Sequence, residues 1–531
     1  MDKKKRSLWF FCIATLALLL GFGIFALIAR VELPKNAEEI ARKPKIYPDY
    51  DLATIPCNIA PLNFQIEEVG RDVRCVLYGE RQGVDGARFV TNERSVCPDV
   101  KVWRKLLLEN SGGRLVAEVY VKGNEDGKWR KFQALAFDVS QDAIDEWLAY
   151  RLLAPGYDYG GWITLEERNL TSFETREIFD NRGTGTCVNC HAFQNRRAEK
   201  FSIHYRVGGG APGSGTILGR DGALRKIDGK VAELNGRLSY PAWRPTGDLA
   251  VFSSNKTFQA LHNLSTQKIE ALDSESDLVL VDTRANRETV ITNTPDEFET
   301  FPNWSQDGKT LYYASANVKL AARVWQGQRR AEEGANRIED FRYNIYKREF
   351  DEKTLTFSEP TLVVDARARE RSAVHPKISP DGKWLVYTQM ASGTFPLWRP
   401  EADLWIKNLA TGEERPLEEV NDRYAESYHA WSSSGRWLAF SSRREDGQYA
   451  RVYLAHIDDS GRASKPFVTP QANPLDNRQN FRAYNVPEFI VEPIPFSKRE
   501  IFNAARGTGE KTTGSGQARA QNSAEIETYF N

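Results

Sequence analysis

Four stretches of the chain repeat one pattern, and this repeat restricts the fold more than any other feature of the sequence. They read "YPAWRPTGDLAVFSS", "FPNWSQDGKTLYYAS", "HPKISPDGKWLVYTQ" and "YHAWSSSGRWLAFSS". Each copy predicts a short strand with a bulky last residue, a tight turn and an apolar strand. Glycine supplies the positive φ that such a hairpin turn requires. The bulky residues are Trp243, Trp304, Ile378 and Trp431, and the turn glycines are Gly247, Gly308, Gly382 and Gly435.

A further strand-like segment follows every copy, as in "SDLVLVDT" and "ADLWIKNL". One four-stranded sheet cannot bury its own faces and must stack with others around an axis, so the repeat predicts a β-propeller. The segment that begins "KFSIHYRV" precedes the first clear copy and is interpreted as an earlier blade. Five blades are therefore visible, and "NFRAYNVPEFIV" is expected to complete a sixth.

The four copies vary around the pattern W-S-P-D-G-K followed by an apolar strand, and this pattern resembles the repeat of TolB-type propellers, a WD40-like repeat. The resemblance implies a TolB-like β-propeller over residues 200–496. Ile378 departs from the pattern, which has tryptophan there, and the last copy has Ser-Ser-Gly in place of Pro-Asp-Gly. Such a repeat is specific for a fold and carries almost no information about activity.

The first 30 residues predict a membrane helix. Four basic residues, Lys3 to Arg6, precede an uncharged apolar run of 22 residues from Leu8 to Ala29. About 20 residues are needed to cross a bilayer in a helix, and the basic flank should stay in the cytoplasm. The expectation is a single-pass anchor in a bacterial inner membrane, with the bulk of the chain in the periplasm. A cleavable signal peptide is the alternative, although its apolar region is usually shorter.

The rest of the chain is expected to be mainly β. Residues 31–50 are interpreted as a stalk, and residues 51–175 as a β-sandwich-like domain whose strands include "KVWRKLLLE". One helix is expected in "SQDAIDEWLAYRLLAP", capped by Ser140. Residues 176–199 are interpreted as a separate segment that contains Cys187, Cys190 and His191. Residues 497–531 are polar and rich in glycine and are expected to be a disordered tail.

Charge and the remaining cysteines restrict partners and redox state. Outside the first 30 residues, 67 basic and 71 acidic residues remain, which argues against a nucleic-acid partner. Cys57, Cys75 and Cys97 would lie on the exported side of the membrane. A disulfide between Cys75 and Cys97 is favoured because each stands beside a strand-like run of one predicted hairpin. Three reduced, buried cysteines are the alternative.

The pentapeptide Cys187-Val-Asn-Cys190-His191 carries the chemistry that the sequence suggests. A structural zinc site needs four ligands, usually in two close pairs, and no second C-x-x-C or H-x-x-x-H occurs. A redox dithiol would stand at the start of a helix in a βαβ unit and would leave His191 unexplained. Covalent haem explains both cysteines, the histidine and an exported location. The sequence carries no G-x-S-x-G or complete phosphate loop, so no catalytic residue is assigned.

The pentapeptide resembles the attachment motif of c-type cytochromes. This resemblance implies one covalent haem c, with thioether bonds to Cys187 and Cys190 and with His191 as the proximal iron ligand. The usual distal methionine is missing, because Met390 lies in a predicted blade strand about 200 residues away. His204, 13 residues after His191, is the first candidate for the distal ligand, and His262 is the second.

These features together predict a membrane-anchored periplasmic monohaem c-type cytochrome that acts in electron transfer. The propeller would provide a docking surface for redox or envelope proteins. A haem-containing scaffold or sensor in the cell envelope is the main alternative, and a C-x-x-C thiol-disulfide oxidoreductase is the third.

Overall fold

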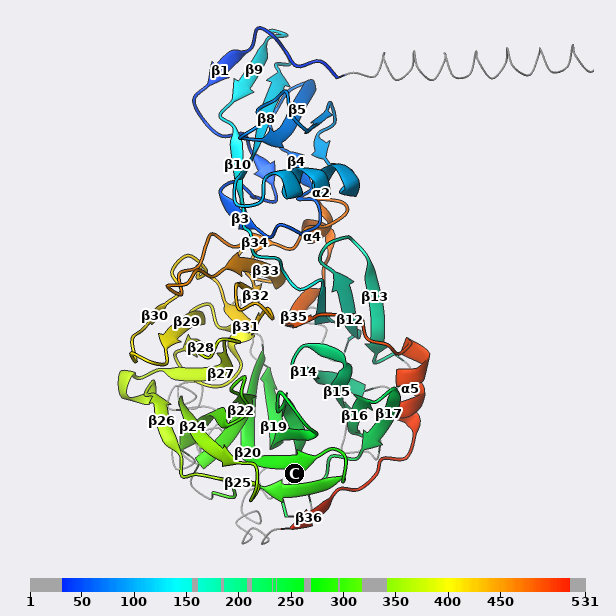
Figure 1. The fold of residues 1–531 in the computed structure, drawn as a ribbon, viewed down its shortest axis with the longest axis vertical. Helices are drawn as coiled ribbons and strands as arrows, with labels where there is room; N and C mark the ends of the chain where they lie inside the picture. Colours follow the sequence, from blue (N-terminus) through cyan, green and yellow to red (C-terminus); the bar gives the residue numbers. More distant parts are fainter. Residues whose placement is uncertain are drawn as a thin grey trace, which may run out of the picture.

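A computed structural model of the chain describes residues 31–154, 161–182, 186–207, 213–231, 233–234, 236–261, 269–294, 297–317 and 341–515. The predicted membrane anchor and His262 lie outside these ranges. Among the described residues, no helix is long and apolar enough to cross a membrane. The described chain is mainly β, as predicted, and forms an N-terminal domain and a ring of sheets (Figure 1).

The N-terminal domain contains a large sheet, a small sheet and one helix. The strands of the large sheet are β1 (Glu38–Ile40), β3 (Ala53–Ile55), β5 (Asp72–Gly79), β6 (Arg88–Thr91), β8 (Arg114–Lys122), β9 (Trp129–Phe132) and β10 (Leu135–Val139). The small sheet contains β2 (Ile46–Tyr47), β4 (Phe64–Ile66) and β7 (Ser95–Val96). Helix α2 (Val100–Glu109) begins at Asp99, whose side chain accepts a hydrogen bond from the Lys101 amide.

Three local predictions for this region are wrong. "KVWRKLLLE" is the helix α2, whose buried residues Trp103, Leu106 and Leu107 follow helical spacing. The segment expected to be a helix contains the strand β11 (Trp147–Leu153), which is buried along almost its whole length. No disulfide joins Cys75 to Cys97, because Cys75 is buried opposite Thr91 in the large sheet while Cys97 is exposed beyond the small sheet.

Six antiparallel sheets follow the N-terminal domain, and we call them blades 1 to 6. Blade 1 has the order β35 (Ala483–Ile490), β11, β12 (Ile163–Asn169), β13 (Thr175–Asp180). Blade 2 contains β14 (Thr186–Gln194), β15 (Arg197–Val207), β16 (Gly215–Arg220) and β17 (Ala223–Ile227). Blade 3 contains β18 (Arg237–Trp243), β19 (Leu249–Leu261), β20 (Ile269–Asp282) and β21 (Arg287–Val290), with β36 (Thr513–Ser515) added at its edge.

The remaining blades are built in the same order. Blade 4 contains β22 (Glu297–Trp304), β23 (Thr310–Asn317), β24 (Tyr343–Asp351), β25 (Thr356–Phe357) and β26 (Thr361–Val364). Blade 5 contains β27 (Ser372–Ile378), β28 (Trp384–Met390), β29 (Asp403–Asn408) and β30 (Glu414–Pro416). Blade 6 contains β31 (Glu426–Trp431), β32 (Trp437–Ser442), β33 (Arg451–His456) and β34 (Phe467–Val468).

The first strands of the blades contact one another in a closed cycle, from β14 through β18, β22, β27 and β31 to β35 and back to β14. This cycle is the arrangement of a β-propeller, and we use the word channel for the central region around which these strands are arranged. The segment "NFRAYNVPEFIV" completes a blade as expected, because its strand β35 pairs with β11. The ring therefore begins at Trp147, and the predicted boundary at residue 200 is wrong.

The repeated hairpins form as predicted. Gly247, Gly308, Gly382 and Gly435 have φ values of 78°, 67°, 72° and 69°. The bulky residues pack between blades, and two of the tryptophans donate a hydrogen bond to the preceding blade. Trp304 Nε1 lies 3.2 Å from the Ala242 carbonyl oxygen, and Trp431 Nε1 lies 3.2 Å from the Lys377 carbonyl oxygen. The repeat therefore encodes both the turn and the contact with the neighbouring blade.

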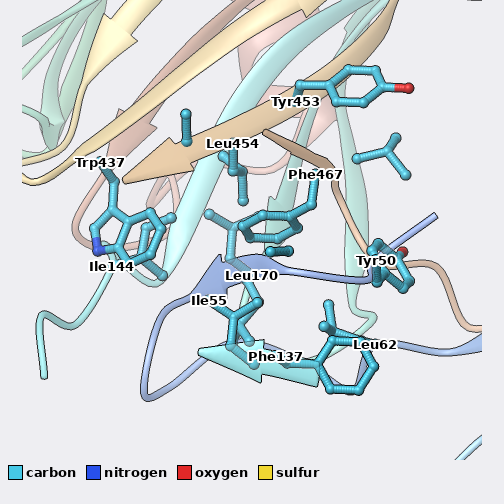
Figure 2. Close-up of a cluster of buried hydrophobic side chains, with 14 of the residues drawn as sticks. Tyr50, Ile55, Leu62, Phe137, Ile144, Leu170, Trp437, Tyr453, Leu454 and Phe467 are labelled. Carbon is cyan, nitrogen blue, oxygen red and sulfur yellow. The ribbon is translucent and has the colours of Figure 1, made fainter. Parts of the chain in front are cut away.

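The N-terminal domain shares a hydrophobic core with blade 6. Figure 2 shows Tyr50, Ile55, Leu62, Phe137 and Ile144, together with Leu170 at the end of β12 in blade 1, against Trp437, Tyr453, Leu454 and Phe467. Polar contacts surround this core: Trp437 Nε1 donates to the Asp142 carbonyl at 3.2 Å, and His456 Nε2 lies 2.7 Å from Asp142 Oδ2. The apolar area that both parts bury makes the domain and the blade one packed unit.

The chain beyond residue 497 also differs from the expectation of disorder. Helix α5 (Lys498–Arg506) begins with a capping box in which Ser497 and Glu500 bond each other's backbone amides. Ile501 and Ala505 of this helix are buried against blade 2 and the outer strand of blade 1. Strand β36 then pairs in parallel with β21. Residues 516–531 lie outside the described part of the chain.

Candidate haem-attachment site

The C-x-x-C-H pentapeptide lies in β14, the first strand of blade 2. Cys187 pairs with Arg206, Cys190 with His204 and His191 with Ile203. Cys190 and His191 are only 9% and 6% exposed. The side chain of Cys187 lies outside the described part. Because β14 pairs with β15 alone in its sheet, its other edge faces the channel.

His191 is a neutral, partly satisfied imidazole. Burial lowers its pKa to about 3, and the nearby cations Arg151 and Lys377 act in the same direction. A hydrogen bond with the Val486 backbone opposes this shift, so the ring donates to the Val486 carbonyl. Nε2 is buried and has no partner, so Nδ1 is the donating nitrogen. One nitrogen fixed on a carbonyl and the other free is the arrangement typical of a metal-ligating histidine.

The side chains of His204 and His191 point to opposite faces of their sheet. Side chains alternate between the two faces of a strand, and residues paired across strands share a face. His191 and its partner Ile203 face blade 1, where Phe193 lies with its ring 6.0 Å from the imidazole. His204 faces blade 3 with Cys190. This pairing does not bring His191 and His204 together, and their ligation of one iron stays a prediction.

His204 is nevertheless an unusual side chain. It is 0% exposed, and its Nδ1 lies 3.1 Å from Thr216 Oγ1. Its Nε2 is buried without a partner, and burial lowers its pKa to about 3. The second candidate ligand, His262, lies outside the described residues. Among those residues, no group of three or more His, Cys, Asp or Glu side chains is arranged to hold a metal ion.

Four aromatic rings line the channel beside the motif, and we call them the girdle: Tyr240, Phe301, His375 and Tyr428. Successive ring centroids lie 4.6, 4.1 and 4.9 Å apart. All four residues have positive φ, between 44° and 54°, at irregularities in the pairing of the first strands. Burial and the nearby Cys190 raise the pKa of both tyrosines.

The repeat explains how Cys190 reaches the girdle. Each girdle residue stands three positions before the bulky residue of its repeat, in "YPAW", "FPNW", "HPKI" and "YHAW". "CHAF" in β14 has the same form, with Phe193 as the bulky residue and Cys190 at the girdle position. The alignment of "CHAF" with the repeat is visible in the sequence and indicates that Cys190 belongs to the first strand of a blade.

Two charged side chains support the motif from blade 1. Arg151 of β11 is 9% exposed, and its Nη1 donates to the Val188 carbonyl, between the two cysteines, at 3.1 Å. Glu488 of β35 accepts a hydrogen bond from the Phe193 amide at 3.4 Å. Burial raises the pKa of Glu488, while Lys377 and Arg196 oppose that shift. The site thus combines a buried thiol, a neutral imidazole and cations in a space of low dielectric.

The donors fit a haem iron in part. His191 offers a free Nε2 on a ring whose Nδ1 donates to the Val486 carbonyl, and Cys190 is the adjacent buried thiol. The two residues occupy consecutive strand positions, so their side chains leave β14 on opposite faces. A porphyrin on one face of β14 would therefore meet only one of them, so these two side chains do not fit a haem in the described strand.

Comparisons with known proteins bear on the fold. No family model and no curated protein matches the chain. Similar solved structures include TolB from Acinetobacter baumannii, with 13% identity, a TM-score of 0.40, and coverage of 74% of this chain and 85% of that one. An oligogalacturonate lyase in complex with manganese has 15% identity, a TM-score of 0.35, and coverage of 79% and 99%. A prolyl endopeptidase has 12% identity, a TM-score of 0.33, and coverage of 62% and 42%. Similarities of this size carry no argument about activity, and the propeller-like architecture rests on the sheet order given above.

Proposed function

We propose that this protein is a membrane-anchored, periplasmic c-type cytochrome with one covalent haem, held in a six-bladed propeller of the TolB type. The observation that carries the proposal is the free, buried Nε2 of His191, one position after the buried thiol of Cys190. Cys187 and Cys190 would form the thioether bonds, and His191 would be the iron ligand. Such a haem supplies reversible one-electron oxidation and reduction.

The chain's own residues prepare the site for this role. The Val486 carbonyl fixes the imidazole of His191, and the low pKa of His191 keeps Nε2 deprotonated at neutral pH. The girdle and the packed first strands leave Cys190 only 9% exposed. The outer surface of the ring would dock redox or envelope partners, and the segment Leu8 to Ala29 would hold the protein at the membrane.

The experiment is covalent haem detection in gels after expression with and without the haem-attachment machinery. We expect the exported chain to stain for haem-dependent peroxidase activity after denaturation, and the double change Cys187→Ala, Cys190→Ala to abolish the stain. Cys57→Ala and Cys97→Ala, which leave the motif intact, are the matched controls and should retain it. An unstained wild-type chain, or a stained double variant, would refute the proposal.

The topology is tested separately. Protease added to spheroplasts should degrade the body of the chain while a cytoplasmic marker survives. A fully protected body would contradict the exported location and, with it, the supply of attachment machinery.

Haem staining and reduction of the same purified protein distinguish two alternative functions. A haem-containing scaffold or sensor would stain but would resist reduction by physiological electron donors, or would bind carbon monoxide at an open iron. A thiol-disulfide oxidoreductase would carry no haem and would need an accessible dithiol. The burial of Cys190 disfavours it, because thiol exchange requires access of the attacking sulfur.

A further inference from the structure

The C-terminal segment of residues 509–515 lies as an extended peptide along the outer strands of blades 2 and 3. From the end of α5 the chain runs outside the ring to β36 (Figure 1). On the way Glu510 bridges Ile227, the last residue of β17, in parallel, and β36 then pairs in parallel with β21. The segment thus covers the edges of two sheets, which are places where a peptide can add a strand. We call residues 226–228 and 286–289, which it covers, the edge site.

Main-chain hydrogen bonds hold the segment on the edge site. The Glu510 amide donates to the Lys226 carbonyl at 2.9 Å, and the Glu510 carbonyl accepts from the Asp228 amide at 3.0 Å. Three positions later, the Thr513 amide donates to the Asn286 carbonyl at 3.1 Å. These bonds do not depend on the side chains at 510 and 513. Only a substitution that takes away the N–H group itself, which means proline, removes these two donors.

The segment is separable from the core of the ring. Among the described residues, the hydrophobic clusters contain no residue after Ala505, which lies near the end of α5. Glu510, Lys511 and Thr513 are exposed. Release of the segment would therefore uncover two sheet edges without opening a core, which is typical of a region with low local stability.

Side-chain contacts restrict which sequence the edge site accepts. A Cβ atom on Gly509 would lie 3.1 Å from the Asp228 amide nitrogen, and one on Gly514 would lie 3.1 Å from Glu288 Oε1. Both distances are shorter than the separation of about 3.5–4.0 Å at which non-bonded atoms pack best. Between the glycines, the Thr512 hydroxyl donates to the Glu288 carboxylate, which is buried. These contacts select the pattern Gly-x-x-Thr-x-Gly.

We propose that the edge site is a docking site for an extended Gly-x-x-Thr-x-Gly peptide, and that residues 509–514 of the same chain are its resident occupant. The occupant is exchangeable, because main-chain bonds and one hydroxyl hold it and no core depends on it. A tethered occupant acts at a high effective concentration, so a free peptide binds only after the chain's own segment has been released. The proposal does not depend on the presence of haem.

The test uses two full-length chains, the wild type and the double variant Glu510→Pro, Thr513→Pro. The variant lacks the two amide donors described above, so its own segment leaves the edge site. A fluorescent peptide with the sequence of residues 508–515, TGEKTTGS, is titrated into each chain, and its anisotropy is measured. Two matched control peptides carry either the same two prolines or the change Thr512→Val.

We expect the variant to bind the peptide at least about tenfold more tightly than the wild type does, because only the variant has an uncovered edge site. The proline peptide should bind at least about tenfold more weakly than the unchanged peptide. The valine peptide should also bind about tenfold more weakly, since it cannot donate to the Glu288 carboxylate. No binding to the variant, equal binding of the proline peptide, or equal binding to the wild type would overturn the proposal.

Two further measurements complete the test. The variant should elute like the wild type in size-exclusion chromatography; a larger species that the peptide does not dissociate would assign the edge site to a second copy of the chain and contradict the proposal. If the variant does not accumulate, hydrogen exchange of the wild type decides. The amides of residues 510 and 513 should exchange at least about tenfold faster than the amides that join β20 to β21. Equal protection would make the segment a fixed part of the fold and refute its exchange.

Discussion

Replacing Trp437 by alanine should destabilise the N-terminal domain and blade 6 together. The side chain is fully buried in the core that the two parts share (Figure 2). Its indole ring packs edge-on against His456, with centroids 4.9 Å apart, and its Nε1 donates to the Asp142 carbonyl. The substitution removes the apolar contacts, opens a cavity and leaves a buried carbonyl without its donor.

The size of the effect follows from these losses. Deleting a buried tryptophan side chain costs about 3–5 kcal/mol, and an unsatisfied buried carbonyl adds about 1–3 kcal/mol. Since a whole domain is stable by only about 5–15 kcal/mol, we expect a loss of at least about 3 kcal/mol in the free energy of unfolding. Trp437→Phe keeps most of the apolar contact and should cost about half as much or less.

The assay is urea unfolding of residues 31–531, followed by circular dichroism and by protease resistance of each part. Trp162→Ala is the control, because Trp162 is 39% exposed and is stacked by Arg182 and Arg482 at 4.0 and 4.2 Å. It should cost about 1 kcal/mol. A loss below about 1 kcal/mol in Trp437→Ala, or an N-terminal domain that keeps its wild-type resistance when blade 6 unfolds, would refute the shared core.

Three further predictions follow from local geometry. Gly382 has φ 72°, and a methyl group at this position would touch no neighbouring atom. Gly382→Ala should therefore lower the stability by about 1 kcal/mol through backbone strain alone, as measured by thermal unfolding. An unchanged stability would contradict the turn conformation. Burial raises the pKa of Asp142, but the hydrogen bonds from His456 and Ser140 outweigh this effect and hold that pKa below its usual value. The stabilisation by this carboxylate is therefore present above a pH of about 4 and is lost as pH falls through the folded pKa. Asp142→Asn should flatten this part of the profile of stability against pH. In stained protein, His204→Ala should leave the ferric spin state unchanged; a conversion to high spin would show that the faces of β14 and β15 differ from those described.

Local signals in the sequence predict the fold at positions where a single structural requirement determines the residue type. The turn glycines and the bulky residues of the repeat are such positions, and the hairpins form where they were expected. Strand β11 was mistaken for a helix because a strand buried on both faces loses its alternation, leaving an apolar run that also fits helical spacing. Helix α5 was missed although Ser497 and Glu500 stand at capping-box spacing, because the glycine-rich residues after it dominated the composition.

The candidate site was predicted only as a motif. Its residue types are visible in the sequence, but their faces depend on the pairing of Cys190 with His204, which no single-strand pattern reveals. Arg151 could not be assigned for a similar reason. Its contact with the Val188 carbonyl exists only after blade 1 has formed beside blade 2.

The pairing of β35 with β11 determines when blade 1 can form during synthesis of the chain. Blade 1 is composed of strands from both ends of the ring, so it cannot form until residues 483–490 have been made. Until then β11 has an unpaired edge and β14 lacks its contact with β35, which leaves the motif open to other proteins, including proteases. Arrival of β35 then buries the motif and brings the Val486 carbonyl to His191. Truncation before this strand should therefore affect more than one blade: the ring would lose its closure, and the C-x-x-C-H motif would stay uncovered.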